Sequence, residues 1–167
     1  CISQKHNVPP NGKKYEKIVA RYLKNAAEHG ANVCFVPLFT PPLNTAVGLY
    51  RQCVQLVDVK EKQDGWDFGY ERVLHFMRLA EKCGMKYFEM AHLFPQWGAE
   101  HPPAVYAEGV NGKRQIFGWK DDSLGERYVG FLREFLTTFV CFLRKNGYGK
   151  DRVLFHISDE PNCNHLE

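Results

Sequence analysis

The sequence predicts an α/β fold, a partial (β/α)8 TIM barrel of about three consecutive β/α units with β-hairpin excursions in the loops. Helix-like and strand-like patterns alternate along the chain, which is typical of parallel strands joined by crossover helices. Long loops and an acidic pair follow the predicted strands, and barrel chemistry gathers at the carboxyl ends of strands. No Gly-x-Gly-x-x-Gly follows a predicted strand, which disfavours a doubly wound sheet.

The composition is that of one folded domain. The chain has 167 residues, of which 44% are hydrophobic and 25% charged, and no linker-like segment divides it. A full barrel takes about 250 residues, and the sequence begins with Cys1 rather than Met. We therefore expect residues 1–167 to form a single partial catalytic barrel domain, truncated at both ends, with the remainder of the barrel supplied by missing chain segments.

Charge and hydropathy indicate neither a nucleic-acid nor a membrane partner. The 22 basic and 19 acidic residues leave a net charge of +3 and are scattered along the chain. The longest uncharged apolar stretch, residues 135–143, is far shorter than the roughly 18 to 20 residues that a membrane-spanning helix needs.

The first part of the chain predicts a helix, a strand and a hairpin. Apolar residues three and four apart predict an amphipathic helix over 13–29, with Gly30 after it. The apolar run 32–39 predicts a strand buried on both faces. The step from Asp64 to Gly65 predicts a hairpin turn, against which Trp66 packs.

The middle of the chain predicts a second unit. Asp67 is the expected cap of a helix that ends before Gly84, and residues 85–93 form the next strand. A long aromatic-rich connection follows over 95–121 and contains the turn signal Asn111-Gly112. Long ordered loops are usually functional.

The last part predicts the longest helix and a third strand. Ser123 and Glu126 have the spacing of a capping box, and an apolar stripe continues toward Gly147. The apolar run 152–158 then predicts a strand, which ends at an acidic pair.

Six widely spaced cysteines without a Cys-x-x-Cys pair disfavour a thiolate zinc site. We expect structural thiols, because Cys34 lies in a strand pattern and Cys141 on an apolar helix face. This usage leans toward a reducing, cytoplasmic compartment. A secretory signal would be absent from a fragment that lacks its start, so the localisation stays unknown.

The acidic pair Asp159 and Glu160 is the strongest candidate for chemistry. Adjacent residues at a strand end point in different directions, so the two carboxyl groups can serve different functions. One can donate a proton to a leaving oxygen while the other stays ionised and stabilises a cation. The alternative is structural: a helix N-cap followed by an acid in the first turn.

Residues 155–161, Phe-His-Ile-Ser-Asp-Glu-Pro, resemble the acidic signature of glycoside hydrolase family 123. The resemblance covers roughly residues 35 to 167. Its other parts, in order, are His92-Leu93-Phe94, Gln96-Trp97-Gly98-Ala99, Phe117-Gly118-Trp119, and Tyr128 with Phe131-Leu132.

The resemblance implies a retaining, substrate-assisted glycosidase of the β-N-acetylgalactosaminidase type. The sugar's own 2-acetamido oxygen would attack the anomeric carbon in place of a carboxylate nucleophile. Glu160 would act as the general acid and then base, and Asp159 would orient the acetamido group. No metal or cofactor is needed, and the partner would be a glycan or oligosaccharide substrate. The fragment alone is expected to be inactive.

Further substrate contacts are expected from the loops that follow the strands. Aromatic rings can stack on a sugar face or simply pack the loop, and a histidine can contact sugar hydroxyls or lie in the core. The candidate substrate-binding residues are His92, Gln96, Trp97, Tyr106 and Trp119. His156 is expected to support the site from below.

Two other functions stay open at this point. A metal-dependent sugar isomerase or hydrolase on a TIM barrel would recruit His156, Glu160 and His165 around a divalent ion. A non-catalytic carbohydrate-binding fragment would use its acids only as caps.

Overall fold

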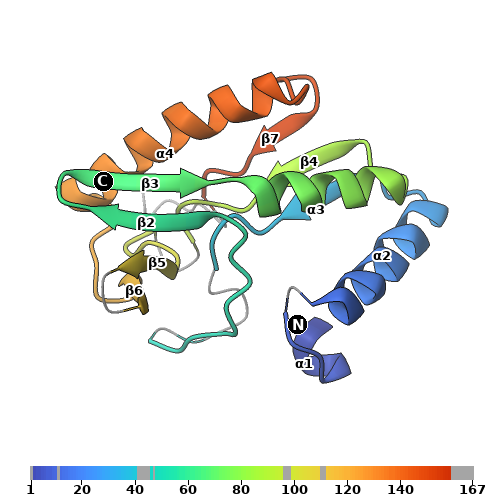
Figure 1. Ribbon diagram of the computed structural model, residues 1–167, viewed down its shortest axis with the longest axis horizontal. Helices are drawn as coiled ribbons and strands as arrows, with labels where there is room; N and C mark the ends of the chain where they lie inside the picture. The colour runs from blue at the N-terminus through green and yellow to red at the C-terminus, as the bar shows by residue number, and fades with distance from the viewer. Residues whose placement is uncertain are drawn as a thin grey trace.

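The computed structural model describes residues 2–10, 12–40, 46, 48–95, 99–109 and 112–158. These residues form a mixed α/β structure with two sheets and several helices (Figure 1). This composition of helices and sheets confirms the α/β class. Neither sheet closes into a barrel within the described ranges, so the partial barrel stays a prediction.

The first sheet has three parallel strands in the order β1-β4-β7. The predicted alternation of helices and strands is confirmed, because a helix precedes each of these strands in the chain (Figure 1). The strands are β1 (Val33–Val36), β4 (Tyr87–Met90) and β7 (Val153–Phe155), and the helices are α2 (Lys13–Glu28), α3 (Glu71–Lys82) and α4 (Glu126–Lys145). A short helix, α1 (Ile2–His6), lies before α2 and was not expected.

The second sheet is made from the two predicted hairpins. Gly65 and Gly112 have positive φ values of 119° and 91°, which explains why glycine stands at these positions. The two hairpins join edge to edge through a parallel contact between β2 and β5, in the order β3-β2-β5-β6. This association was not predicted. The strands are β2 (Asp58–Lys62), β3 (Gly65–Gly69), β5 (Val105–Gly109) and β6 (Gly112–Phe117).

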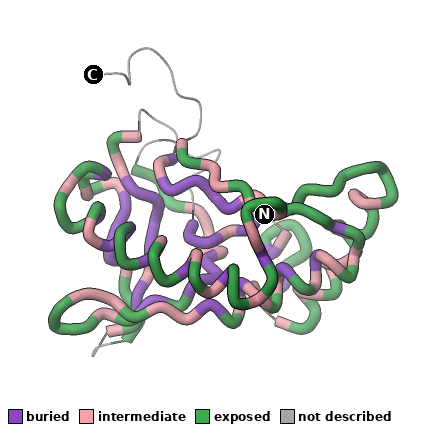
Figure 2. Tube along the Cα trace, turned by 90° about the horizontal axis from the view of Figure 1, so that it is seen from above, coloured by how far each residue is buried: buried purple, intermediate pink, exposed green. Residues whose placement is uncertain are grey.

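Helix α4 carries the aromatic core that joins the two sheets. Phe131, Phe135 and Phe139 follow one another at four-residue spacing and stack, with centroids 6.3 Å and 5.1 Å apart. Phe131 meets Trp66 of β3 at 5.2 Å, which confirms the expected hairpin packing of Trp66. Phe139 meets Phe155 of β7 at 6.3 Å. Buried residues accordingly lie in the middle of the molecule (Figure 2).

Two predicted helix caps are wrong. Asp67 lies in β3 opposite Lys60, and α3 begins only at Glu71. Asp67 instead forms a 3.4 Å ion pair with Lys62, because the hairpin continues through its position. Ser123 is buried and its hydroxyl donates to the carbonyl of Ala99. Helix α4 therefore starts after Gly125, without a side-chain cap.

One face of the parallel sheet is apolar and exposed. Cys34, Val36, Phe88 and Met90 point into the core. The alternate positions on the same strands point the other way, and the apolar ones among them are 37% to 52% exposed, so the strand expected over 32–39 is not buried on both faces in residues 1–167. These outward residues, which we call the open face, are Val33, Phe35, Tyr87 and Leu154.

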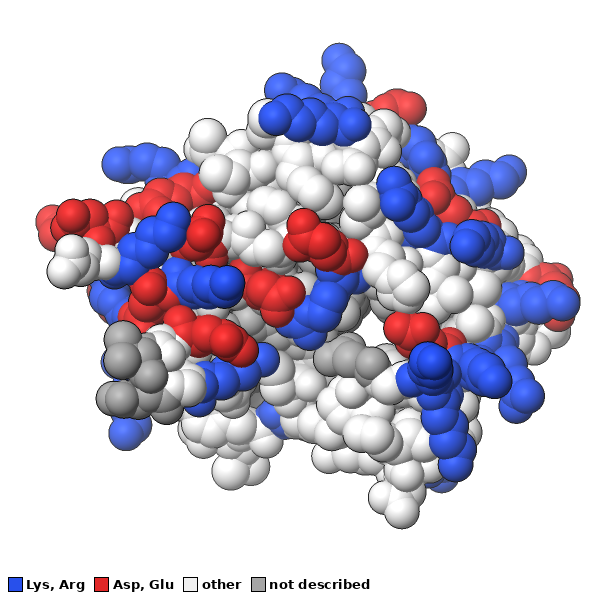
Figure 3. Space-filling view, in the orientation of Figure 1, with Lys and Arg blue, Asp and Glu red and all other residues white. Residues whose placement is uncertain are grey.

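The surface carries interspersed charges. Acidic and basic side chains alternate over the face shown in Figure 3. Glu61 of β2, for example, forms ion pairs with Arg114 at 2.6 Å and with Arg127 at 3.4 Å. None of the helices in the described part of the chain is long and apolar enough to cross a membrane.

The thiols at positions 34, 53, 83 and 141 are free. Cys34 is buried as expected, whereas Cys141 is exposed on α4, because it lies away from the aromatic stripe. Burial raises the pKa of Cys34 to about 12, and the nearby Cys83 adds to the shift.

The two environments predict selective alkylation. At pH 8, a thiol with a pKa of about 12 is thiolate in only about one molecule in 10⁴. We expect iodoacetamide to modify Cys141 in the native protein and to leave Cys34 intact until unfolding, as measured by peptide mass spectrometry. Equal labelling of both thiols in the native protein would contradict the burial of Cys34.

Candidate active site

The candidate active site lies where the segments after β4 and β7 run side by side. The N–H of Phe94 donates to the carbonyl of Ile157 at 3.0 Å, and Phe94 and Ser158 form a parallel bridge. The pairing of β4 with β7 therefore continues beyond the two strands. It brings residues 91–94 next to residues 156–158, at the carboxyl ends where the chemistry of parallel sheets is found.

His156 lies between two hydrogen-bond acceptors. Its Nδ1 is 2.7 Å from the carboxylate of Glu89 on β4, and its Nε2 is 3.0 Å from the carbonyl oxygen of Ser158. A neutral imidazole has one donor nitrogen only, whereas an imidazolium has two. Both contacts are therefore hydrogen bonds donated by His156 only when its ring carries two protons, in which case it forms an ion pair with Glu89.

His92 is buried beside His156. Only 3% of His92 is exposed, and its ring centroid is 5.1 Å from that of His156 and 6.4 Å from that of Phe35. The structure thus brings together His92 and His156, which the sequence analysis had placed separately. Their rings stand over the carboxyl end of the open face, of which Phe35 is part.

Tyr128 of α4 fixes the backbone next to His92. Its hydroxyl donates to the carbonyl of Leu93 at 2.7 Å, and its ring packs edge-on against Phe94 at 6.1 Å. Burial raises the pKa of Tyr128, so the phenol remains a neutral donor. The aromatic helix therefore helps to set the loop that carries His92.

Trp119 lies in a different part of the loop region, next to Leu49 and His101. Its indole N–H donates to the carbonyl of Leu49 at 2.7 Å, and its ring packs against His101 at 5.8 Å. A small hollow beside it is lined by Thr40, Tyr50 and Ala104, among others. Trp119 thus contributes to loop packing, and its N–H is already engaged by the protein.

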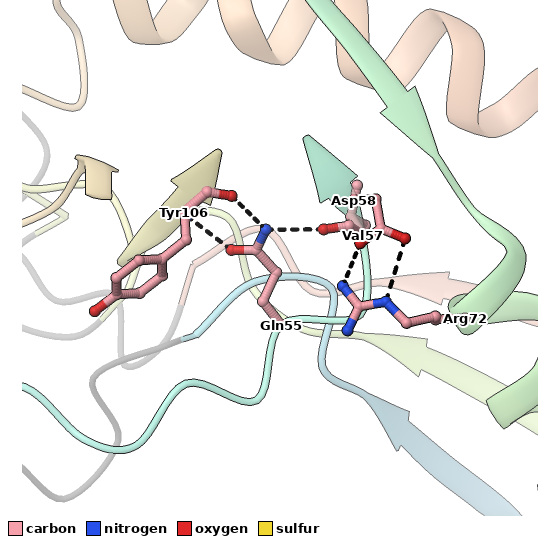
Figure 4. A network of polar contacts seen from close by, with 5 residues as sticks. All are labelled: Gln55, Val57, Asp58, Arg72 and Tyr106. Atoms are coloured by element: carbon pink, nitrogen blue, oxygen red, sulfur yellow. Dashed lines mark hydrogen bonds and ion pairs between the residues drawn. The ribbon is translucent and has the colours of Figure 1, made fainter. Parts of the chain in front are cut away.

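Tyr106 lies on β5, and its backbone is held by a residue that the sequence analysis missed. The side-chain amide of Gln55 donates to the carbonyl of Tyr106 at 2.7 Å and to that of Val57 at 2.8 Å, while its oxygen accepts the N–H of Tyr106 at 2.9 Å (Figure 4). The phenol ring points away from Gln55 in Figure 4. Burial raises the pKa of Tyr106, and Cys53 and Tyr50 add to the shift.

Gln55 and the neighbouring ion pair anchor the second sheet. Only 2% of Gln55 is exposed, and its buried amide finds its partners in the backbone of Tyr106 and Val57. Arg72 of α3 holds Asp58 of β2 with contacts of 2.6 Å and 3.2 Å (Figure 4). A buried glutamine has no sequence signal of its own, because only the tertiary structure reveals its partners.

The remaining predicted site residues lie outside the described residues. These are the two carboxylates, Asp159 and Glu160, the loop residues Gln96 and Trp97, and His165 of the metal alternative. Among the side chains that the structure describes, no three His, Cys, Asp or Glu residues gather as a metal site would need. A larger hollow of about 180 Å³ lies elsewhere, between α2, α3 and the segment 54–56.

The hydroxyl of Tyr128 predicts a measurable loss of stability. In Tyr128→Phe the buried carbonyl of Leu93 loses its donor, which costs about 1 to 3 kcal/mol. Tyr22→Phe is the matched control, because the Tyr22 hydroxyl is bonded at an exposed site. Its effect should stay within about 0.5 kcal/mol. Urea unfolding of both variants measures the difference, and equal losses would contradict the role given to Tyr128.

Comparisons with known proteins agree on one family. The model of the glycoside hydrolase 123 catalytic domain matches residues 1–167. A solved structure of a family 123 glycoside hydrolase from Clostridium perfringens, described in terms of glycolipid glycan hydrolysis, superimposes with a TM-score of 0.70 at 14% identity. The match covers 99% of this chain and 28% of that one. A search of curated proteins gave no match. The chain belongs to the glycoside hydrolase 123 catalytic domain family.

Proposed function

We propose that this chain contributes the catalytic carboxylates of a retaining, substrate-assisted glycoside hydrolase. Its substrates would be N-acetylhexosamine glycosides, in the first place those of β-N-acetylgalactosamine. The observation that carries the proposal is the family match over residues 1–167, which includes the Asp159-Glu160 pair just after the third parallel strand. The resemblance of the acidic signature to family 123 supports the same assignment.

The position of the preceding residues supports a catalytic role for this pair. Ser158 is bridged to Phe94, so the chain leaves β7 at the carboxyl edge of the parallel sheet, close to His92. Chemistry on such sheets is found at that edge. A pair of acids that follows Ser158 directly therefore begins in the right place to meet a substrate there.

The proposed reaction has two steps, formation of an oxazolinium-like intermediate and its hydrolysis. The 2-acetamido oxygen attacks the anomeric carbon while the bond to the leaving oxygen breaks, and the carboxylic acid of Glu160 donates its proton to that oxygen. Asp159 accepts a hydrogen bond from the acetamido N–H and stabilises the positive charge of the oxazolinium-like intermediate. Water then attacks the anomeric carbon while the bond from that carbon to the acetamido oxygen breaks, which restores the amide, and the carboxylate of Glu160 takes up the proton of the water.

We also propose that β1, β4 and β7 are neighbouring strands of a larger (β/α)8 barrel, as the sequence analysis expected. The open face supports this, because its apolar residues would then face the barrel interior. The chain spans 28% of the length of the similar solved structure. The remaining strands would therefore come from other segments of the complete protein.

Substrate contacts are assigned by position. His92, of which only 3% is exposed in residues 1–167, would face the sugar from the end of β4, with Gln96 and Trp97 in the loop that follows. Trp119 and Tyr106 would form a second wall of the site, where only the face of Trp119 is available because its N–H is bonded to Leu49. His156 would support the site from beneath.

The metal-dependent alternative, in which His156, Glu160 and His165 would hold a divalent ion, is separated from the proposed mechanism by a chelator. Activity that survives excess EDTA would exclude the metal version, and activity abolished by EDTA and restored by a divalent ion would support it.

The role of Glu160 is tested by Glu160→Gln in the complete protein. We expect kcat/KM on N-acetylhexosamine glycosides with poor leaving groups to fall by about 10² to 10⁴, because the proton donor is lost. The loss should be much smaller with an activated aryl glycoside, whose leaving group needs no proton. Glu28→Gln, at an exposed position on α2, is the control. Equal activity of Glu160→Gln and the parent protein would refute the assignment.

A second prediction concerns residues 1–167 alone. We expect no turnover of aryl N-acetylhexosaminides by this part of the protein, because the open face is uncovered and the sugar pocket lacks its other walls. Assay of residues 1–167 beside the complete protein measures this. Turnover by residues 1–167 at a rate near that of the complete protein would contradict the partial barrel.

A further inference from the structure

Glu89 lies beneath the proposed active site, although no sequence motif gives this residue a role. It projects from β4 on the same side as Phe35 and Leu154, where a carboxylate is otherwise surrounded by apolar residues. Its oxygen is 2.7 Å from Nδ1 of His156, and about a third of each side chain is exposed. A half-buried acid on an apolar sheet face is costly unless it is paired.

The second ring nitrogen of His156 extends this contact to the backbone. Nε2 lies 3.0 Å from the carbonyl oxygen of Ser158, and the N–H of His156 is 3.4 Å from the carbonyl of Met90. The Ser158 oxygen belongs to the peptide unit that leads out of the strand toward the acidic pair. Because a peptide unit is planar, a bond to its oxygen fixes its orientation.

We propose that Glu89 and His156 form a charged positioning pair for the catalytic acids. Glu89 orients the imidazolium of His156, whose Nε2–H holds the Ser158 carbonyl and so sets the direction in which the chain enters Asp159 and Glu160. Neither residue needs to touch the sugar. This inference rests on the proposed function, since its target is the alignment of the acid with the leaving oxygen.

The neighbouring charges are consistent with this role. The titratable side chains that face His156 include Glu89 from β4 and His92 from the segment after it. With Gln at position 89 the negative charge that pairs with the imidazolium is lost. A neutral His156 can donate from only one ring nitrogen, so the charge-assisted bond to the Ser158 carbonyl is either lost or replaced by a weaker neutral one.

The test is Glu89→Gln in the complete protein, with Glu81→Gln as the matched control. Glu81 is also a half-buried, paired carboxylate, but its partners Arg152 and Tyr148 lie at the amino end of β7. For Glu89→Gln we expect kcat on poor leaving groups to fall by about 10- to 100-fold with KM nearly unchanged. The loss should be several-fold smaller on an activated aryl glycoside, because that substrate does not need an aligned acid.

Two outcomes would overturn the pair. One is a Glu89→Gln variant whose loss is independent of the leaving group or equals that of Glu81→Gln, since a general loss of stability would have this effect. The other comes from ¹⁵N NMR of the histidine rings, with His156 assigned by His156→Gln. Two protonated ring nitrogens at the assay pH support the pair, and one protonated nitrogen refutes it.

The NMR measurement also separates this proposal from the proposed function. If the complete parent protein hydrolyses no glycoside, the proposed function fails, and the spectra alone decide whether His156 holds both acceptors. If the parent protein is active and the spectra show a neutral His156, the proposed function stands and the pair is rejected.

Discussion

The aromatic stripe of α4 is the interaction on which both sheets depend. Phe131, Phe135 and Phe139 are fully or almost fully buried, and their rings contact β3 on one side and β7 on the other. Burying three phenylalanine side chains contributes several kcal/mol, which is comparable with the net stability of a domain. One turn before this stripe, Tyr128 holds the backbone beside His92. The packing that stabilises the fold therefore also sets one wall of the proposed site.

The elements were predictable because their signals are local. Period-four apolar residues gave the three long helices, and the glycines at 65 and 112 gave both hairpins. The caps failed for a tertiary reason, since Ser123 is used to hold the loop at Ala99 and Asp67 is used in the hairpin. The joining of the hairpins into one sheet depends on β2 and β5, which are more than 40 residues apart, and on the buried amide of Gln55. No local pattern records such a contact.

The candidate site also has parts that local patterns predict and parts that only the tertiary structure shows. The acidic signature stands out in the sequence because its residues are consecutive; His92 was expected at the end of a strand and His156 within one. Their contact, and the part taken by Glu89, follow only from the register that places Glu89 beside Leu154. An acid within a strand pattern is ordinarily taken as a solvent-facing residue. Here the alternation of the strand places Glu89 on an apolar face, where it needs a partner, and this is why its contact with His156 indicates a role.

The two ends of the β4–β7 pair carry different kinds of charge. At the amino end, Glu81 is held by Arg152 at 2.6 Å and by the hydroxyl of Tyr148, and burial raises the pKa of Tyr148 to about 12. At the carboxyl end, Glu89 is paired with a histidine, whose charge depends on its surroundings. The guanidinium of Arg152 keeps its charge, which suits the end of a parallel sheet that contributes to stability rather than to chemistry. The charge of a histidine is not fixed in this way, and the contact of His156 with the Ser158 carbonyl is best explained if the ring serves to align the residues that follow.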